Sequence, residues 1–139
     1  MGMKIAVIGS KEYENKTKIK DFIFSLSNQS KHISNQIIIA SGGRNHGADK
    51  YVKKYSIEFG LLYKEYNPAH TTYNLYSAMK PSYYGKSKMI YDETLRNKIM
   101  IDSIHKLVIF LNEHEIPSKE IQDIIKYAEK KSKKIIIVN

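Results

Sequence analysis

A glycine-rich stretch holds the residues of this chain that are best suited to chemistry. It reads Ser41-Gly42-Gly43-Arg44-Asn45-His46-Gly47-Ala48-Asp49, follows an apolar run that ends at position 40, and precedes a segment with helical apolar spacing. A strand, a glycine-rich turn and the beginning of a helix present backbone N–H groups to an anion, usually a phosphate. The stretch therefore predicts an anion-binding loop, with Ser41, Gly42 and Gly43 at the ligand.

Charged side chains in and near this loop are further candidates. Arg44 and Arg96 are two of very few arginines in a lysine-rich chain, and a guanidinium group matches the geometry of a phosphate. A surface ion pair is the alternative role for Arg96. Asp49 is expected in or near the first turn of the helix, where a carboxylate suits the helix dipole, so capping is its expected role. The five histidines show no metal-ligand spacing and cysteine is absent, so no metal site is expected.

These residues need a scaffold that brings distant loops together. Apolar runs at 4–8, 36–40, 106–111 and 135–138 predict buried parallel strands. The segment 61–66, which ends at Asn67-Pro68, is a further predicted strand. Helical spacing at 19–26, 48–59, 90–104 and 118–128 predicts helices between them, with a polar loop over 27–35. The alternation predicts an α/β fold: a Rossmann-like, doubly wound parallel sheet of five strands in the order 3-2-1-4-5, with helices on both faces and one domain over residues 1–139.

The expected strand order also predicts where a ligand binds. The order reverses between the first and fourth strands, and ligands bind at such a point outside the carboxyl ends of the strands. Gly9-Ser10, the glycine-rich stretch and the segment with Asn112 and Glu113 follow those strand ends. Glu113 and Glu115 are candidates for a general acid or base at this rim, with a solvated acidic turn as the alternative.

Composition limits the class of protein and of partner. The net charge of +9 suits nucleic acid or another polyanion, but AT-rich coding, which raises Lys, Ile, Asn and Tyr together, accounts for it as well. No apolar run approaches the roughly 20 residues that cross a bilayer, and no signal peptide precedes the first strand. We therefore expect a soluble, cytoplasmic protein without a membrane partner.

Tyrosines gather around an irregular segment at residues 69–89. Nine of the eleven tyrosines lie between positions 51 and 91. A loop of this length in a compact domain is usually a lid or a binding loop, and tyrosine stacks on bases and sugars. The tyrosines of this segment therefore form either a lid that stacks on a base or a partly buried surface, which could be an oligomer contact.

Several motifs occur in an order that matches a known group of proteins. They are Ile5-Ala6-Val7-Ile8-Gly9-Ser10-Lys11-Glu12-Tyr13, the stretch 41–49, Tyr84-Gly85-Lys86, Arg96-Asn97 and the strand 107–111. On these motifs the chain resembles the SLOG superfamily, which includes DprA and the LOG phosphoribohydrolases, and within it the small single-domain YspA-type family. The resemblance implies a nucleotide-derived ligand approached by Gly9, Ser10 and Lys11, with its phosphate held by Gly42 and Gly43. It also implies that Asp49 structures the turn and that Arg96 reaches into the pocket.

Two features differ from the family pattern and shape the functional hypothesis. Residues 112–118 stand where the family carries a Gly/Ser-rich turn, and the LOG-type motif with its catalytic glutamate is absent. We therefore expect a module that senses or sequesters a nucleotide-like small molecule, such as an ADP-ribose derivative, without a cofactor. The alternatives are a phosphoribohydrolase-type enzyme that uses Glu113, Glu115 or Asp49, and DprA-like binding of single-stranded DNA. A homodimer is a further expectation, because SLOG proteins often form dimers.

Overall fold

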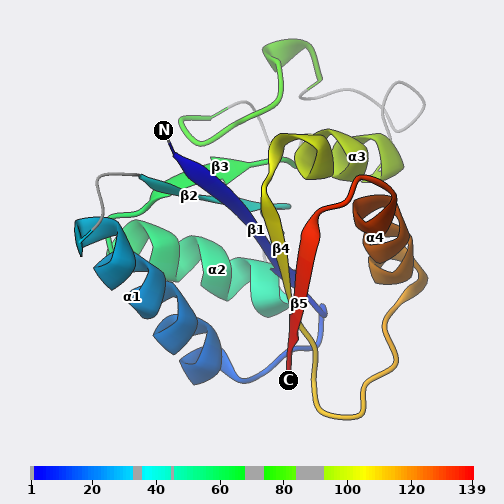
Figure 1. Cartoon of the computed structure of the whole chain (residues 1–139), viewed down its shortest axis with the longest axis horizontal. Helices are drawn as coiled ribbons and strands as arrows, with labels where there is room; N and C mark the ends of the chain where they lie inside the picture. The colour runs from blue at the N-terminus through cyan, green and yellow to red at the C-terminus, as the bar shows by residue number, and fades with distance from the viewer. Residues whose placement is uncertain (1, 33–35, 45, 68–73, 84–92) are drawn as a thin grey trace.

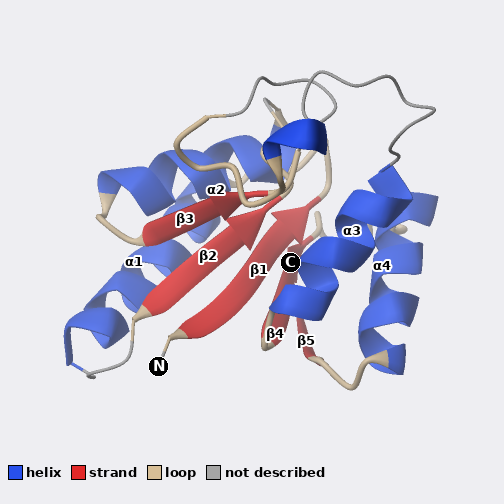
Figure 2. Ribbon diagram, turned by 90° about the horizontal axis from the view of Figure 1, so that it is seen from above, coloured by secondary structure: helices blue, strands red, loops and turns tan. Residues whose placement is uncertain are grey.

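The protein is built on a parallel five-stranded sheet, described by a computed structural model except at residues 1, 33–35, 45, 68–73 and 84–92. The strands lie in the order β3-β2-β1-β4-β5, and every neighbouring pair is parallel. Figure 2 shows α1 and α2 on one face of the sheet and α3 and α4 on the other. The elements are β1 (Met3–Gly9), α1 (Lys16–His32), β2 (Ile37–Ser41), α2 (Gly47–Glu58), β3 (Leu62–Glu65), α3 (Glu93–Ser103), β4 (Lys106–Phe110), α4 (Lys119–Lys130) and β5 (Lys134–Val138) (Figure 1).

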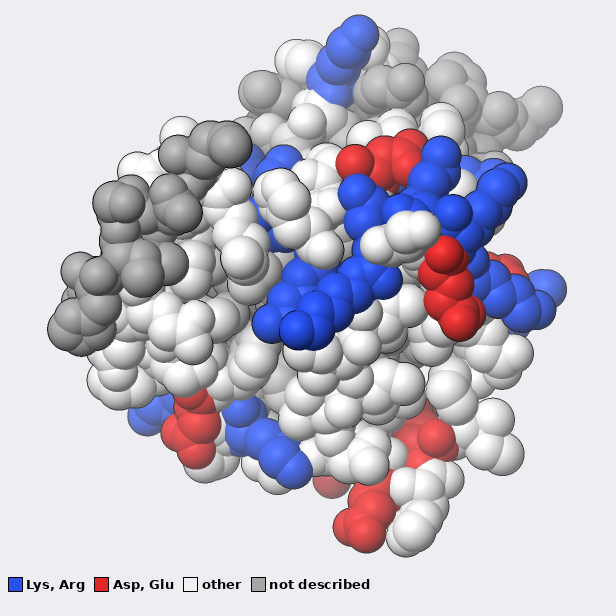
Figure 3. All heavy atoms as spheres, in the orientation of Figure 1, with Lys and Arg blue, Asp and Glu red and all other residues white. Residues whose placement is uncertain are grey.

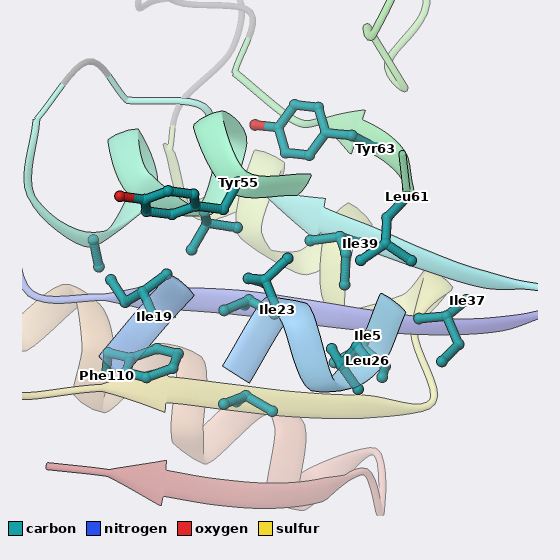
Figure 4. Close-up of a cluster of buried hydrophobic side chains, with 14 of the residues drawn as sticks. Ile5, Ile19, Ile23, Leu26, Ile37, Ile39, Tyr55, Leu61, Tyr63 and Phe110 are labelled. Atoms are coloured by element: carbon teal, nitrogen blue, oxygen red, sulfur yellow. The ribbon is translucent and has the colours of Figure 1, made fainter. Parts of the chain in front are cut away.

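Alternate residues of the central strands enter two separate cores. Ile5 and Val7 of β1 pack in the core beneath α1 and α2, and Ala6 and Ile8 pack in the core beneath α3 and α4. Figure 4 shows the first core, where apolar side chains of α1 lie over β1, β2 and β4. Burial on both faces explains the unbroken apolar runs of these strands. The predicted α/β fold and strand order are therefore confirmed.

Side chains and glycines at the helix ends explain where most helices begin and stop. The Asn15 side chain accepts a hydrogen bond from the Lys18 N–H (3.2 Å) and caps α1, and the Ser118 hydroxyl accepts one from the Ile121 N–H (3.3 Å) and caps α4. Gly60, with φ of 76°, follows α2 in the left-handed conformation that terminates helices.

The prediction that the chain leaves the first helix at residue 27 is wrong. Helix α1 continues to His32, well beyond Leu26, the last apolar residue of its predicted face. The extension is held by Ser27, a buried residue whose hydroxyl donates to the Phe59 carbonyl at the end of α2 (3.2 Å). A polar residue that faces a neighbouring helix end is invisible to a search for apolar spacing. The rest of that predicted loop, residues 33–35, lies outside the described residues.

The predicted irregular segment 69–89 is described only in part. Residues 74–77 form a turn whose Ser77 bridges Glu65 at the end of β3, and Pro81–Tyr83 form a short 3-10 helix. Tyr76 packs edge-on against Tyr63 with ring centroids 5.7 Å apart, so this tyrosine supports the core. Tyr73, Tyr84 and Tyr91, with the rest of the predicted lid, lie outside the described residues. In the described part of the chain no helix is long and apolar enough to cross a membrane.

Candidate functional site

The carboxyl end of β1 is packed tightly against its neighbours. A Cβ on Gly9 would lie 2.5 Å from the Phe110 carbonyl oxygen and 2.6 Å from the Ala48 Cβ, so glycine is needed there. The Ser10 N–H donates to the Phe110 carbonyl (3.0 Å), and the Ala48 N–H donates to the Ser10 carbonyl (3.1 Å). The first loop is thus fixed between β4 and the first turn of α2, at the point where the strand order reverses.

A cleft of about 260 Å³ opens between this loop and the beginning of α4. The predicted residues Gly9, Ser10, Lys11 and Arg44 line one side of the cleft. The other side comes from the segment between β4 and α4 and from the first turn of α4: Glu115, Ile116, Ser118, Glu120 and Ile121. The cleft therefore combines two cationic side chains with several carboxylates, Glu12 included.

Glu120 of α4 forms an ion pair with Arg44. One guanidinium nitrogen of Arg44 donates to both carboxylate oxygens of Glu120, at 2.6 and 2.8 Å. The side chain of Arg44 is 13% exposed and that of Glu120 is 27% exposed, so solvent screens this pair only partly. The guanidinium group of Arg44 therefore holds an oxyanion at the edge of the cleft.

Arg96 of α3 is buried and holds the glycine-rich loop in place. Its Nη1 donates to the carbonyl oxygens of Gly42 (3.3 Å) and Tyr66 (3.1 Å), and its Nη2 lies 4.0 Å from the Glu120 carboxylate. The predicted surface ion pair is therefore not its arrangement, because the residue is only 3% exposed. Arg96 ties the ends of β2 and β3 to α3.

Asp49 lies beneath the two arginines in the first turn of α2. Burial raises its pKa to about 6, although Arg96, Arg44 and a hydrogen bond from the Arg44 backbone N–H favour the ionised form. His46, at the N-cap position of α2, makes no side-chain capping bond. The Asp49 carboxylate thus reaches back to the loop before the helix. Together Asp49, Arg44, Arg96 and Glu120 form a cluster of alternating charge, which we call the charge cluster.

The glycines of the predicted loop make room for side chains of the protein itself. A Cβ on Gly42 would overlap the Arg96 guanidinium and would lie 3.0 Å from an Asp49 carboxylate oxygen. Gly43 has φ of 73°, and a Cβ there would overlap the Glu65 side chain. The Gly43 N–H donates to the Ser41 hydroxyl (3.3 Å). Charged side chains therefore pack directly against Gly42 and Gly43, and the backbone conformation at Gly43 favours glycine.

Glu65 at the end of β3 is a second buried carboxylate beside this loop. It is fully buried and accepts from the Lys53 ammonium (3.0 Å), the Asn74 amide (3.2 Å) and the Tyr63 hydroxyl (3.4 Å). Burial, followed by the charge of Glu65, raises the pKa of Tyr63 well above its usual value. Three partners satisfy the carboxylate, which is the condition for burying a charge at tolerable cost.

The segment between β4 and α4 is closed by its own hydrogen bonds. The Asn112 N–H donates to the Glu115 carboxylate (2.9 Å), and the Asn112 amide donates to the Glu12 carbonyl (3.2 Å). Glu113 is 78% exposed beside His114 and is not among the residues that line the cleft. Of the two glutamates suggested as acid or base at this rim, the structure therefore places Glu115 at the cleft and Glu113 in solvent.

Two carboxylates of this region were not foreseen from the sequence. Glu120 comes two residues after the capping Ser118, a position where a carboxylate normally indicates no more than a favourable helix dipole. Glu65 lies inside the predicted strand 61–66, beside Lys64, where the sequence gives no sign that it is buried. Their partners come from other segments, so only the folded chain brings each carboxylate to a cation.

The described residues include no group of three or more His, Cys, Asp or Glu side chains placed to hold a metal ion.

No protein-family model and no curated protein matches the sequence. Among solved structures, the chain is similar to the molybdenum cofactor carrier protein from Chlamydomonas reinhardtii, with a TM-score of 0.59, 16% sequence identity, and coverage of 99% of this chain and 76% of that one. This likeness shows that the chain has a Rossmann-like α/β fold.

Proposed function

We propose that this protein binds a nucleotide-derived small molecule, such as an ADP-ribose derivative, in the cleft at the carboxyl ends of β1 and β4. It would act as a sensor or a sequestering module. The observation that carries the proposal is the guanidinium of Arg44, which lines the cleft and already holds the oxyanion of Glu120. Phosphate and carboxylate oxygens bind a guanidinium group in the same manner.

The loop after β1 supports the same assignment. Gly9 brings the backbone close to β4 and α2, and the exposed Lys11 of the same loop lines the cleft. The cleft also lies at the beginning of α4, whose first N–H groups carry partial positive charge. A phosphate placed between Lys11 and Arg44 would therefore meet two cations and a helix N-terminus.

The similar solved structure adds general support. That protein is named as a carrier of the molybdenum cofactor, a small molecule. A binding role without chemistry agrees with such a fold and with the absence of the LOG-type motif from this sequence. The predicted homodimer is a separate proposal, which sedimentation of the protein at several concentrations would test.

Thermal unfolding in the presence of nucleotides tests the proposal. A ligand at a hundred times its dissociation constant stabilises the folded state by about 2.7 kcal/mol, so ADP-ribose, AMP or ATP at millimolar concentration should raise the melting temperature. Lys11→Ala should weaken the ligand about fivefold through loss of one exposed cation. The matched variant Lys20→Ala removes an exposed lysine of α1 and should leave binding unchanged. If no nucleotide stabilises the protein, or if both variants bind equally well, the proposed site is wrong.

One observation favours a second candidate, a nucleotide hydrolase. Asp49 is a buried carboxyl group with a pKa of about 6 beside two arginines, and perturbed carboxyl groups are frequent at catalytic sites. An enzyme of this kind would release product from a nucleotide, and Asp49→Asn would abolish that release. Product formation that survives in Asp49→Asn would remove this residue from the reaction.

A further inference from the structure

A groove lies between α3 and α4. It has a volume of about 560 Å³, within the range of about 300–1,000 Å³ that is usual for small-molecule sites. Its floor is formed by the half-buried Tyr127 of α4, together with Ile101 of α3 and Ile124 of α4, which are buried. It touches the charge cluster only at Glu120, so the groove is separate from the loop of β1 and from Arg44.

Lysines without acidic partners surround this floor. Lys98 of α3 and Lys126 and Lys130 of α4 are exposed, line the groove, and form no ion pair with a residue that the structure describes. The two carboxylates of the groove are already engaged, Asp123 by Lys119 (3.9 Å) and Glu120 by Arg44. The groove therefore carries uncompensated positive charge over an apolar floor.

The tyrosine of the floor is held in a fixed orientation. Its hydroxyl donates to the Asp102 carboxylate (2.8 Å), and the ammonium groups of Lys98 and Lys131 lie 5.7 and 5.5 Å from the centre of its ring. Lysine side chains also gather over α4 and the beginning of β5 in the space-filling view (Figure 3). Two cations over one aromatic ring suit a ligand that is both apolar and negatively charged.

We propose that the groove between α3 and α4 is a second binding site, which takes a small organic anion with a flat apolar body, such as an aromatic carboxylate, sulfonate or phosphate. The apolar body of the ligand lies against Tyr127 and the methylene chains of the lysines, and its anionic group meets the ammonium groups of Lys98, Lys126 and Lys130. Charge complementarity selects the anion, because an uncharged ring would leave three neighbouring ammonium groups without a counter-charge. The assignment does not depend on the function proposed for the cleft.

A pair of fluorescent dyes tests this site. The probe is 8-anilinonaphthalene-1-sulfonate, and the control dye is N-phenyl-1-naphthylamine, which has the same ring system without the sulfonate. The sulfonate dye should bind saturably with one dye per chain and more tightly than the neutral dye. The double variant Lys126→Glu/Lys130→Glu should weaken the sulfonate dye about tenfold, because each reversal replaces an exposed attraction with a repulsion.

A matched variant separates the site from the overall charge of the protein. Lys16→Glu/Lys20→Glu has the same spacing and the same change in net charge, but lies on α1. It should leave dye binding unchanged, as should Lys11→Ala in the cleft. Equal weakening by both double variants, binding without saturation, or equal affinity for the two dyes would overturn the proposal. Displacement of the dye by ADP-ribose would also overturn it, because the groove would then belong to the nucleotide site.

Discussion

The buried carboxyl group of Asp49 makes a prediction about stability and pH. Its pKa is raised from 3.8 to about 6 in the folded protein, mainly by burial. Between these two pH values the unfolded chain has lost this proton and the folded chain has kept it, so unfolding releases a proton. The contribution of Asp49 to stability is therefore greatest at a pH below 3.8, the pKa of Asp49 in the unfolded chain. It falls as the pH rises to about 6 and is constant at higher pH.

The magnitude follows from the difference between the two pKa values. At about 1.4 kcal/mol per pH unit, ionisation of Asp49 costs the folded state about 3 kcal/mol at neutral pH. Asparagine has a similar shape and cannot ionise. The free energy of unfolding of the protein, relative to that of Asp49→Asn, should therefore decrease by about 2.5 kcal/mol between about pH 4 and about pH 8, because part of the loss has already occurred at pH 4.

Urea unfolding followed by circular dichroism at a series of pH values measures this difference. Asp21→Asn is the control, because it makes the same substitution at an exposed residue of α1, far from the charge cluster in the sequence. If the difference for Asp49→Asn is independent of pH, burial does not perturb this carboxyl group. If the difference increases with pH, the arginines outweigh burial and stabilise the carboxylate, and the sign of the argument is wrong.

Two further predictions concern the glycine-rich loop and its glutamate partner. Gly43→Ala should destabilise the fold by about 3 kcal/mol, because alanine is strained at positive φ and its Cβ overlaps the buried Glu65. Gly60 has φ of 76° and open space around it, so Gly60→Ala should destabilise the fold by only about 1 kcal/mol. Equal losses of stability in urea unfolding would contradict the packing argument. Glu120→Gln should bind pyrophosphate about tenfold more tightly in calorimetry, because the variant lacks the carboxylate that is bound to Arg44 in the native protein. Weaker binding would mean that the Glu120 carboxylate contributes to binding of the ligand.

The sequence was sufficient to predict the scaffold because the scaffold depends on local patterns. Unbroken apolar runs identify strands buried on both faces, and their alternation with helices leaves few arrangements of a parallel sheet. The same reasoning placed Gly9 and Gly42 at one edge of the sheet, where the structure has them. The end of α1 was missed because Ser27 is fixed by a hydrogen bond to a residue of α2, more than thirty positions away in the sequence.

The polar interior of the site could not be predicted in the same way. The ion pairs of Glu120 in the charge cluster join residues from separate segments: Arg44 before α2, Arg96 on α3 and Glu120 on α4. Pairing of this kind depends on side-chain reach and on desolvation, and neither leaves a periodic pattern in the sequence. A carboxylate near a helix beginning is also common for reasons that involve no partner, so its sequence position carried little information.

These contacts change the role that we assign to the glycine-rich loop. A phosphate loop needs glycine so that a ligand can approach its backbone, but here the space beside Gly42 and Gly43 is taken by Arg96 and Glu65. The glycines therefore let the protein bury its own charges beneath the loop, and they set the position from which Arg44 enters the cleft. On this view a ligand meets the side chain of Arg44 and the loop of β1 before it meets the glycine backbone. Replacement of Arg44 by Lys keeps the charge and loses the planar guanidinium group, so it should lower the affinity for a phosphate ligand about tenfold in calorimetry. An unchanged affinity would mean that the backbone of the glycine-rich loop binds the anion.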